Sequence, residues 1–354
     1  MKNKNLLKID SEFLAYLRGV SIFIIVFGHV GGFWVFGSYS GLLHLSVTTF
    51  FFLSGAVSYY SFLRAGSVRQ YYIKRISGLI IPFYLLGILS LFVYLATYRH
   101  LPSLSMENII MWLTVKPVKT ITPFPIGQVW FLHTLLIISI VSPLYYKLYE
   151  KNKSILILIL IIFLSISCIQ AFIDIDEYFY IGSHNFFKPI VHSIFFISGF
   201  VYFTYPQYKN NKQILLLMFV LSILLCFGMV LVMNQEFDFS KHTFAPDIYY
   251  VFGTYSLLSL LFLLQNFIIK VVNRIKPVYI FLRFMYKHTF SIFLLHSFAI
   301  YLSEVVFNIV EPQNKDFIYG VKKILIVLLI TFILSVPYSY ISSYVIKKTV
   351  KLTT

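Results

Sequence analysis

Hydrophobic residues in this chain occur in long uninterrupted blocks that are separated by short polar connections. A hydrocarbon layer about 30 Å thick is crossed by about 20 helical residues, because each residue of a helix rises about 1.5 Å. The pattern therefore predicts about ten transmembrane helices. The expected spans lie roughly at 13–36, 42–63, 76–98, 128–149, 154–173, 187–204, 213–233, 247–269, 287–308 and 321–346.

The continuity of these blocks also separates helices from membrane barrel strands. Barrel strands alternate apolar and polar residues over segments of about ten residues, and these blocks do not alternate. Lipid offers no hydrogen-bond partner to the backbone, and a helix satisfies its own backbone groups. We therefore expect an all-α, polytopic integral membrane protein.

Charged residues in the connections predict the orientation of the spans. If the N-terminus is cytoplasmic, the inner connections carry most of the Lys and Arg residues and the outer ones carry most of the loop acids. This is the distribution of the positive-inside rule, and an even number of spans places both termini in the cytoplasm. The exceptions are Lys116, Lys119, Lys322 and Lys323.

Composition agrees with a membrane protein and excludes some other classes. Hydrophobic residues make up 59% of the chain and charged residues 12%, against roughly half and a quarter in soluble domains. The net charge of +16 does not indicate nucleic-acid binding, because the cations are spread over connections that face anionic lipid. Cys168 and Cys226 lie inside apolar blocks and indicate neither a disulfide framework nor a zinc site.

The chain shows no sign of a second domain. The first apolar block is too long for a signal peptide and is interpreted as a retained span. The longest connection, about 99–127, is rich in proline and is expected to fold as an external cap or a re-entrant loop. With no internal repeat, the simplest organisation is a single transmembrane domain over residues 1–354.

Two ionisable residues in the first block are the main candidates for a functional site, because charges inside a membrane are costly. Arg18 and His29 are eleven residues apart. Eleven steps of about 100° return to within roughly 20° of the start, which predicts one shared face and an axial separation of about 16 Å. Alternatively, Arg18 reaches the lipid headgroups and His29 caps a neighbouring helix.

The chemistry of these two residues favours a reaction with a phosphorylated donor. A neutral histidine acts as a general base near neutral pH, and an arginine fork binds phosphate. A base on the outer side and a phosphate clamp on the inner side suit a long cytoplasmic donor such as a coenzyme A thioester.

Other polar residues in the blocks allow both a structural and a functional interpretation. Ser54 is a candidate site-lining residue, although Ser54 and Gly55 together favour close helix packing. Arg75 is either part of a basic interface or a second phosphate contact. Trp130, His133 and His296 are candidate site-lining residues, whereas placement at the interface explains the remaining span histidines, His44, His192 and His288. No metal, Walker or dinucleotide motif is found, so we expect no bound metal or permanent cofactor.

Taken in order, these motifs resemble the acyltransferase-3 family of bacterial membrane acyltransferases, which includes surface-polysaccharide O-acetyltransferases. The resemblance covers nearly the whole chain. Its residues are Arg18-Gly and His29 in the first span, Phe52-Leu-Ser-Gly55 in the second, Arg75 with Ile81-Pro82-Phe-Tyr84, Trp130-Phe-Leu132, and Ser291 to His296. Two positions depart from the pattern of many relatives: Ala15 replaces an acid and Leu79 replaces an arginine.

The resemblance implies transfer of an acyl group, usually acetyl, from cytoplasmic acyl-CoA to a hydroxyl of an extracytoplasmic glycan or its lipid-linked precursor. His29 would then be the catalytic residue, and Arg18 and Arg75 would bind the CoA phosphates. The expected location is the inner membrane of a bacterium. The alternatives are a transporter or glycan flippase without acyl transfer, and an enzyme that acylates a small molecule or peptidoglycan.

Overall fold

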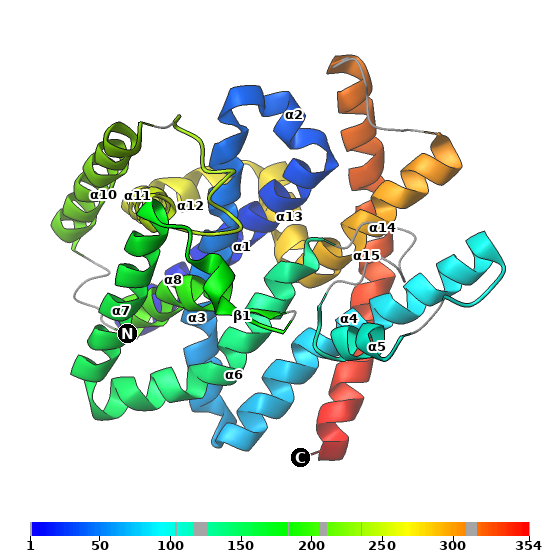
Figure 1. Ribbon diagram of the computed structural model, residues 1–354, viewed down its shortest axis with the longest axis horizontal. Coiled ribbons are helices and arrows are strands. Elements are labelled where there is room, and N and C mark those ends of the chain that lie inside the picture. The colour runs from blue at the N-terminus through cyan, green and yellow to red at the C-terminus, as the bar shows by residue number, and fades with distance from the viewer. Residues whose placement is uncertain are drawn as a thin grey trace. The chain divides into compact units, whose positions relative to one another are not determined.

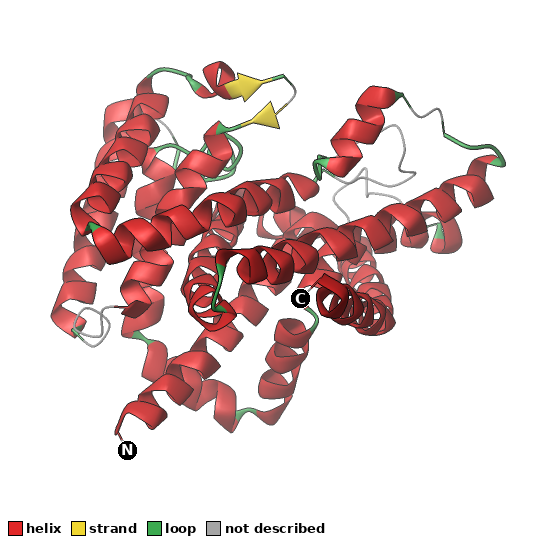
Figure 2. Ribbon diagram, turned by 90° about the horizontal axis from the view of Figure 1, so that it is seen from below, coloured by secondary structure: helices red, strands yellow, loops and turns green. Residues whose placement is uncertain are grey.

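A computed structural model describes residues 2–102, 105–116, 127–182, 184–204, 211–234, 236–308 and 317–353. Helices make up nearly all of it (Figures 1 and 2). Strands are limited, among these residues, to an antiparallel pair of two-residue strands, β1 (Tyr180–Ile181) and β2 (His184–Asn185). The predicted all-α fold class is therefore confirmed.

Helices of the first half of the chain follow the predicted blocks. They are α1 (Lys2–Phe27), η1 (Gly28–Gly32), α2 (Phe33–Phe36), η2 (Gly37–His44), α3 (Leu45–Ala65), α4 (Val68–Tyr98), α5 (Met106–Leu113), α6 (Val129–Lys151) and α7 (Lys153–Phe172). The second half contains η3 (Asp176–Phe179), α8 (Phe187–Thr204), α10 (Lys212–Met233), α11 (Ile248–Leu263), α12 (Gln265–Arg274), α13 (Lys276–Lys287), α14 (Thr289–Phe307) and α15 (Phe317–Thr353).

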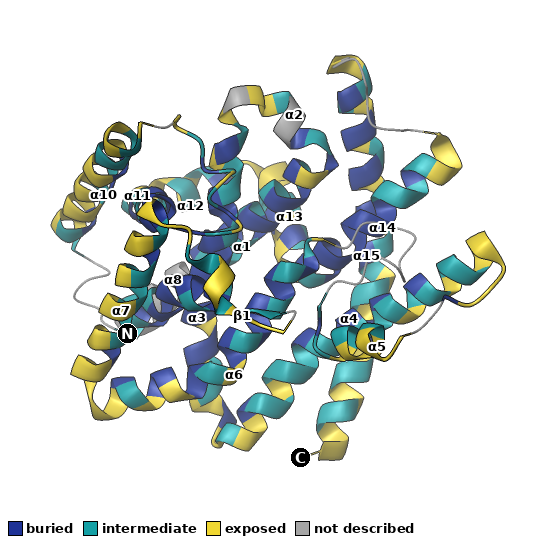
Figure 3. Cartoon of the chain, in the orientation of Figure 1, coloured by how far each residue is buried: buried dark blue, intermediate teal, exposed yellow. Residues whose placement is uncertain are grey.

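The number of spans agrees with the sequence pattern. Nine of the described helices are long and apolar enough to cross a membrane, or ten if α11 and α12, which are bent by 63°, form one span. Only 11% and 17% of the residues in the most apolar segments of α7 and α10 are buried, against 67% for α6 and α8. Figure 3 shows α10 covered largely by exposed residues, so α7 and α10 offer their apolar side chains to lipid.

Three predicted boundaries are wrong, and each has a local cause. The third span begins at Val68 rather than 76, because the Ser67 side chain caps the helix by accepting a hydrogen bond from the Gln70 amide. The first span is not continuous to 36, since it breaks at η1. Residues 270–287 are not a loop: they form the end of α12 and all of α13. Hydropathy finds apolar length but does not register caps or amphipathic helices.

The long connection is described only in part. Residues 103–104 and 117–126, with Lys119, Pro117, Pro123 and Pro125, lie outside the described residues. The described part contains α5, whose Trp112 ring stacks on Phe83 of α4 with centroids 4.9 Å apart. This segment therefore packs against α4, and its external location stays a prediction.

The helices group into two compact units. Unit 1 comprises Met1–Ile25, Phe36–Ser61 and Leu144–Lys287, and unit 2 comprises Val26–Val35, Phe62–Pro143 and His288–Thr354. Whether they form the single domain expected from the sequence stays a prediction, and each unit is described by itself below.

Unit 1 is held together by a close crossing of α3 and α8. A Cβ atom added to Gly55 would collide with the Phe196 carbonyl, and one added to Gly199 would collide with the Phe52 carbonyl. The two backbones approach this closely because both helices carry glycine at the crossing. Next to it, the His192 ring is fully buried and stacks on Phe51 with centroids 4.4 Å apart. Its ring therefore packs between helices of unit 1, and the expectation that His192 lies at the level of the membrane interface stays a prediction.

In unit 2, α14 and α15 pack against each other and against α4. The Tyr338 hydroxyl of α15 donates a hydrogen bond to the Pro82 carbonyl, next to the proline that interrupts the hydrogen bonding of α4. On α6, Ser142 bonds the Tyr71 hydroxyl at 2.7 Å, and the Ile140 carbonyl accepts from Tyr72 at 2.7 Å. These bonds tie the cytoplasmic third of α4, as predicted by the topology, to α6.

Replacing Gly55 by Val is expected to destabilise the fold by about 1–3 kcal/mol, because the added side chain meets a backbone carbonyl that cannot move without moving α8. Thermal unfolding of the purified protein in detergent measures the loss. Gly228→Val on α10 is the control, since nothing lies within 4 Å of the Cβ position there. Equal midpoints for the two variants would contradict a tight crossing at Gly55.

Candidate functional site

His29 and His296 form a stacked pair in unit 2. The two ring centroids are 5.1 Å apart and the ring planes differ by 11°. His296 comes from α14 and is 1% exposed, whereas the His29 side chain, in η1, is exposed. The structure thus brings together the expected catalytic histidine and one of the candidate site-lining residues, with one ring buried and the other open to a reactant.

The buried ring has a defined hydrogen-bonding role. His296 Nδ1 lies 2.6 Å from the Phe293 carbonyl oxygen, which can only accept. Nδ1 therefore carries the proton, and in the neutral ring the lone pair is on Nε2. A second polar contact lies one residue further along α14, where the Gln128 side-chain amide donates to the Ser297 hydroxyl.

The position of His29 depends on a glycine-rich break. Phe27 ends α1, and the chain then makes a wide π-helical turn from Gly28 to Gly32. Gly31 has φ +129°, a backbone conformation that residues with a Cβ rarely adopt, and its Cβ position would lie 3.2 Å from Ile324 of α15. The prediction that Arg18 and His29 share one face assumed a regular helix with about 100° per residue. That assumption holds only as far as Phe27, where α1 ends.

Arg75 lies in the second turn of α4 and has an unsatisfied donor. Its Nε donates to the Ser139 hydroxyl of α6 at 3.1 Å. Its Nη2 is buried and has no hydrogen-bond partner among the described residues. Buried polar groups are normally paired, so this guanidinium suits an anionic ligand. Leu79, one turn further along where many relatives carry a second arginine, is buried and apolar.

Arg18 lies in unit 1, between two aromatic rings. Its Cζ atom is 5.2 Å from the Phe50 ring centroid and 6.0 Å from that of Tyr286. Gly19, the next residue, lies so close to α13 that its Cβ would be 2.7 Å from the Leu282 carbonyl oxygen. The close approach of α1 to α13 therefore sets the surroundings of Arg18.

The remaining candidates are divided between the units. Ser54 is buried in unit 1 beside the glycine of the α3–α8 crossing, which favours its packing role. Trp130 and His133 are half-buried on α6 in unit 2, the unit of the histidine pair. Their participation in the site stays a prediction. No group of three or more His, Cys, Asp or Glu side chains that could hold a metal is found in the described part of the chain.

Sequence reasoning did not single out several residues that the structure places at these sites: Gln128, Ser139, Tyr286 and Ser297. Gln128 and Ser297 carried a weak signal, since each is a polar residue next to a motif residue. Tyr286 carried none, because aromatic residues are common near membrane interfaces.

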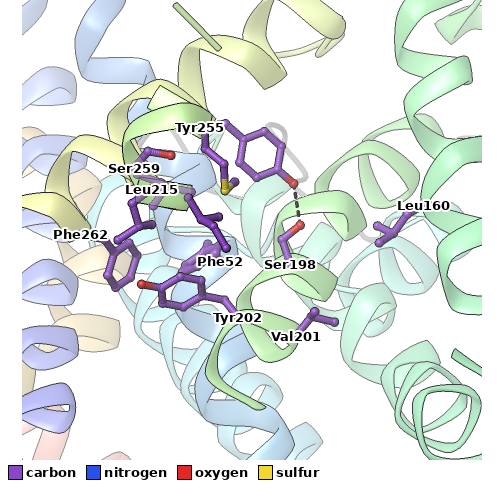
Figure 4. Close-up of a pocket in the computed structure, with 12 residues that line it drawn as sticks. Phe52, Leu160, Ser198, Val201, Tyr202, Leu215, Tyr255, Ser259 and Phe262 are labelled. Carbon is purple, nitrogen blue, oxygen red and sulfur yellow. Dashed lines mark hydrogen bonds between the residues drawn. The ribbon is translucent and has the colours of Figure 1, made fainter. Parts of the chain in front are cut away.

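A cavity of about 260 Å³ in unit 1 contains none of the expected catalytic or donor-binding residues (Figure 4). It is lined by apolar and aromatic side chains of α3, α7, α8, α10 and α11, among them Phe52 and Phe262. Two of the lining hydroxyls, those of Ser198 and Tyr255, form a hydrogen bond of 2.5 Å with each other. Such a lining suits a hydrocarbon group better than a phosphate or a sugar.

Comparison with protein families identifies the family to which this chain belongs. A family model described as an acyltransferase domain matches residues 11–344, nearly the whole chain. The chain belongs to the acyltransferase-3 family. Comparisons with curated proteins and with solved structures gave no match. The family and the spans together make the protein a multi-pass membrane acyltransferase, as the motifs predicted.

Replacing Gly31 by Ala is expected to reduce acyl transfer more than a change of stability explains. A Cβ at φ +129° costs about 1–3 kcal/mol of strain, which the chain relieves by moving the turn that carries His29. The ratio of acyl-transfer rate to folded protein, measured against Gly37→Ala, isolates this effect. Gly37 also has positive φ but no atom within 4 Å of its Cβ position. Equal losses in the two variants would show that strain alone, rather than His29 placement, is responsible.

Proposed function

We propose that this protein transfers an acetyl group from cytoplasmic acetyl-CoA to a hydroxyl of an extracytoplasmic surface polysaccharide or its lipid-linked precursor. The observation that carries the proposal is the stacked His29–His296 pair within a chain of the acyltransferase-3 family. The proposed location is the inner membrane of a bacterium, with the lipid bilayer, acyl-CoA and the glycan as partners.

The proposed reaction needs a base and a way to release the thiolate. His29, the exposed ring of the pair, accepts the proton of the acceptor hydroxyl as that oxygen attacks the thioester carbon. The C–O bond forms, the C–S bond breaks, and the CoA thiolate leaves and takes up the proton from the His29 imidazolium, which restores the neutral ring. In the covalent alternative, His29 receives the acyl group first and passes it to the hydroxyl.

His296 is well placed to support the exposed ring. Its proton is held on Nδ1 by the Phe293 carbonyl, and its buried ring lies flat against His29. The stacking restricts the rotation of His29 and presents its edge, rather than its face, to a reactant. Precise placement of a reacting group accounts for a large share of enzymatic rate enhancement.

The arginines supply the donor side of the proposal. Arg75 has a buried donor that finds no partner among the described residues, and Arg18 has a guanidinium near two rings. Phosphate oxygens would satisfy such donors with charge-assisted hydrogen bonds. Family membership favours group transfer over the alternative of a transporter or flippase, which would move its substrate unchanged.

Replacing His29 by Ala is expected to lower acetyl transfer at least about 100-fold, because general acid–base catalysis contributes that much or more. NMR of surface glycan from a deletion strain, complemented with wild type or variant at equal protein levels, measures the O-acetyl content. His100→Ala is the control, since His100 is exposed in unit 2, bonds the adjacent Leu101 carbonyl and contacts the nearby Tyr94 and Tyr98 rings of α4.

Unchanged O-acetyl signals in the deletion strain would remove this glycan as the acceptor. Turnover of acetyl-CoA by membranes then distinguishes a different acceptor from a protein without acyl-transfer activity. Full activity of the His29→Ala protein would contradict the proposed catalytic role.

Replacing Arg75 by Gln is expected to raise the KM for acetyl-CoA about tenfold or more, because a charge-assisted bond to phosphate is lost. The kcat is expected to change less, since the residue binds the donor away from the thioester. Lys74→Gln is the matched control: it removes the adjacent, exposed cation of α4. A similar rise in KM for both variants would indicate a general effect of charge at the membrane surface.

A further inference from the structure

The segment 265–287 has an unbalanced charge. It contains five cations, Lys270, Arg274, Lys276, Arg283 and Lys287, and no acidic residue. Repulsion among like charges on one short segment is costly unless anions lie nearby. The positive-inside rule accounts for the cytoplasmic location of such a segment but not for its structure.

The segment is folded rather than a loose connection. Both α12 and α13 are amphipathic, and their apolar sides close around α1: Val272 and Leu282 are buried against Tyr16. The Tyr16 hydroxyl also bonds the Asn273 side chain at 2.6 Å. The helix pair is therefore a fixed part of unit 1, and the opposite side of α13 remains exposed.

The exposed side of α13 combines two cations with an aromatic ring. Arg283 and Lys287 are four residues apart and Tyr286 is three residues from Arg283, so all three lie along one side of the helix. Arg283, Tyr286 and Lys287 are exposed, and Tyr286 as a residue is 45% exposed. Arg283 is held in place by a 2.7 Å bond from Nη1 to the Tyr279 hydroxyl.

This side of α13 adjoins Arg18, which the Tyr286 ring contacts. The close approach of Gly19 to the Leu282 carbonyl makes that arrangement specific, since a larger residue at 19 would push the helices apart. Tyr286, which neighbours Arg283 and Lys287 on α13, therefore also contacts Arg18, which is already proposed to bind the donor.

We propose that Arg283, Tyr286 and Lys287 of α13, together with Arg18, bind the adenosine 3′-phosphate 5′-diphosphate part of the acyl-CoA donor. This inference rests on the proposed function. Arg283 and Lys287 neutralise phosphate groups, and the exposed face of Tyr286 stacks on the adenine base. The pantetheine arm then leads away from the nucleotide.

Anionic lipid headgroups are the other source of phosphate for this surface, and the binding experiment distinguishes the two sources. Headgroup binding requires only charge, and any cations at the interface provide it. A nucleotide adds a planar base, and an exposed tyrosine between cations is the complement to that base and its phosphates.

The test is the affinity of the purified full-length protein for fragments of the coenzyme. The protein is held in nanodiscs of zwitterionic lipid, and Kd is measured by calorimetry for CoA, dephospho-CoA, pantetheine and adenosine 3′,5′-bisphosphate. Arg283→Gln and Lys287→Gln are each expected to weaken binding of CoA and of the bisphosphate about tenfold, because each loses a charge-assisted bond. Pantetheine binding is expected to stay unchanged.

Two further substitutions separate stacking and position from general charge. Tyr286→Leu is expected to weaken CoA binding several-fold, whereas Tyr286→Phe keeps the ring and the affinity. Lys276→Gln removes an exposed cation about 10 Å away at the other end of α13 and is expected to have no effect.

Unchanged CoA affinity in both Arg283→Gln and Lys287→Gln overturns the inference, as does an effect that appears only with anionic vesicles. Equal weakening of CoA and pantetheine overturns it as well, since the change would then be general. The proposed function fails separately: it fails if the wild type transfers no acetyl group from acetyl-CoA. If transfer occurs and Arg75→Gln impairs it while the α13 variants do not, only this inference is lost.

Discussion

The break in the first span is the constraint on which the histidine site depends. A regular helix through residues 28–32 would continue to rotate its side chains by about 100° per residue, whereas the wide turn at Gly28–Gly32 interrupts that rotation. The interruption requires a residue at φ +129°, which glycine provides at position 31.

The second member of the pair is held by ordinary packing. His296 lies in the middle of a helix whose neighbouring side chains are nearly all buried, and its Nδ1–H donates a hydrogen bond to the carbonyl one turn earlier. A polar ring in such surroundings has its orientation determined by hydrogen bonding to the preceding turn and by the ring stacked on it. A buried imidazole, that of His296, thus lies against an exposed one, that of His29. The buried ring supports the exposed ring in the proposed reaction.

The positions of the basic residues also depend on secondary structure that hydropathy did not predict. Hydropathy assigned Arg75 and the cluster around Arg283 to connections, and both belong to helices. A cation on a helix has a defined direction, which a cation on a loop lacks. The Ser67 cap begins α4 early enough to include Arg75, and the packing of α13 on α1 exposes Arg283 and Lys287 on one side.

Much of the fold was accessible from the sequence because lipid leaves the backbone few choices. Apolar length is sufficient to predict a membrane helix, and the spans at Lys153–Phe172, Phe187–Thr204 and Lys212–Met233 match their predicted blocks to within one or two residues. Family membership was also predictable, since the short motifs and their order can be read directly from the sequence. His192 shows the limit, because its position near a span end in the sequence does not reveal that its ring is buried on Phe51.

The sequence by itself determined the helical class, the number of spans and the identity of His29, Arg18 and Arg75 as candidates, since these depend on local composition and spacing. Only the tertiary structure decided that His296 stacks on His29, that a buried donor of Arg75 finds no partner in the described part of the chain, and that Tyr286 contacts Arg18. These contacts join residues far apart in the chain. They depend on how helices pack at Gly19 and Gly31, which the apolar pattern of either helix alone does not encode.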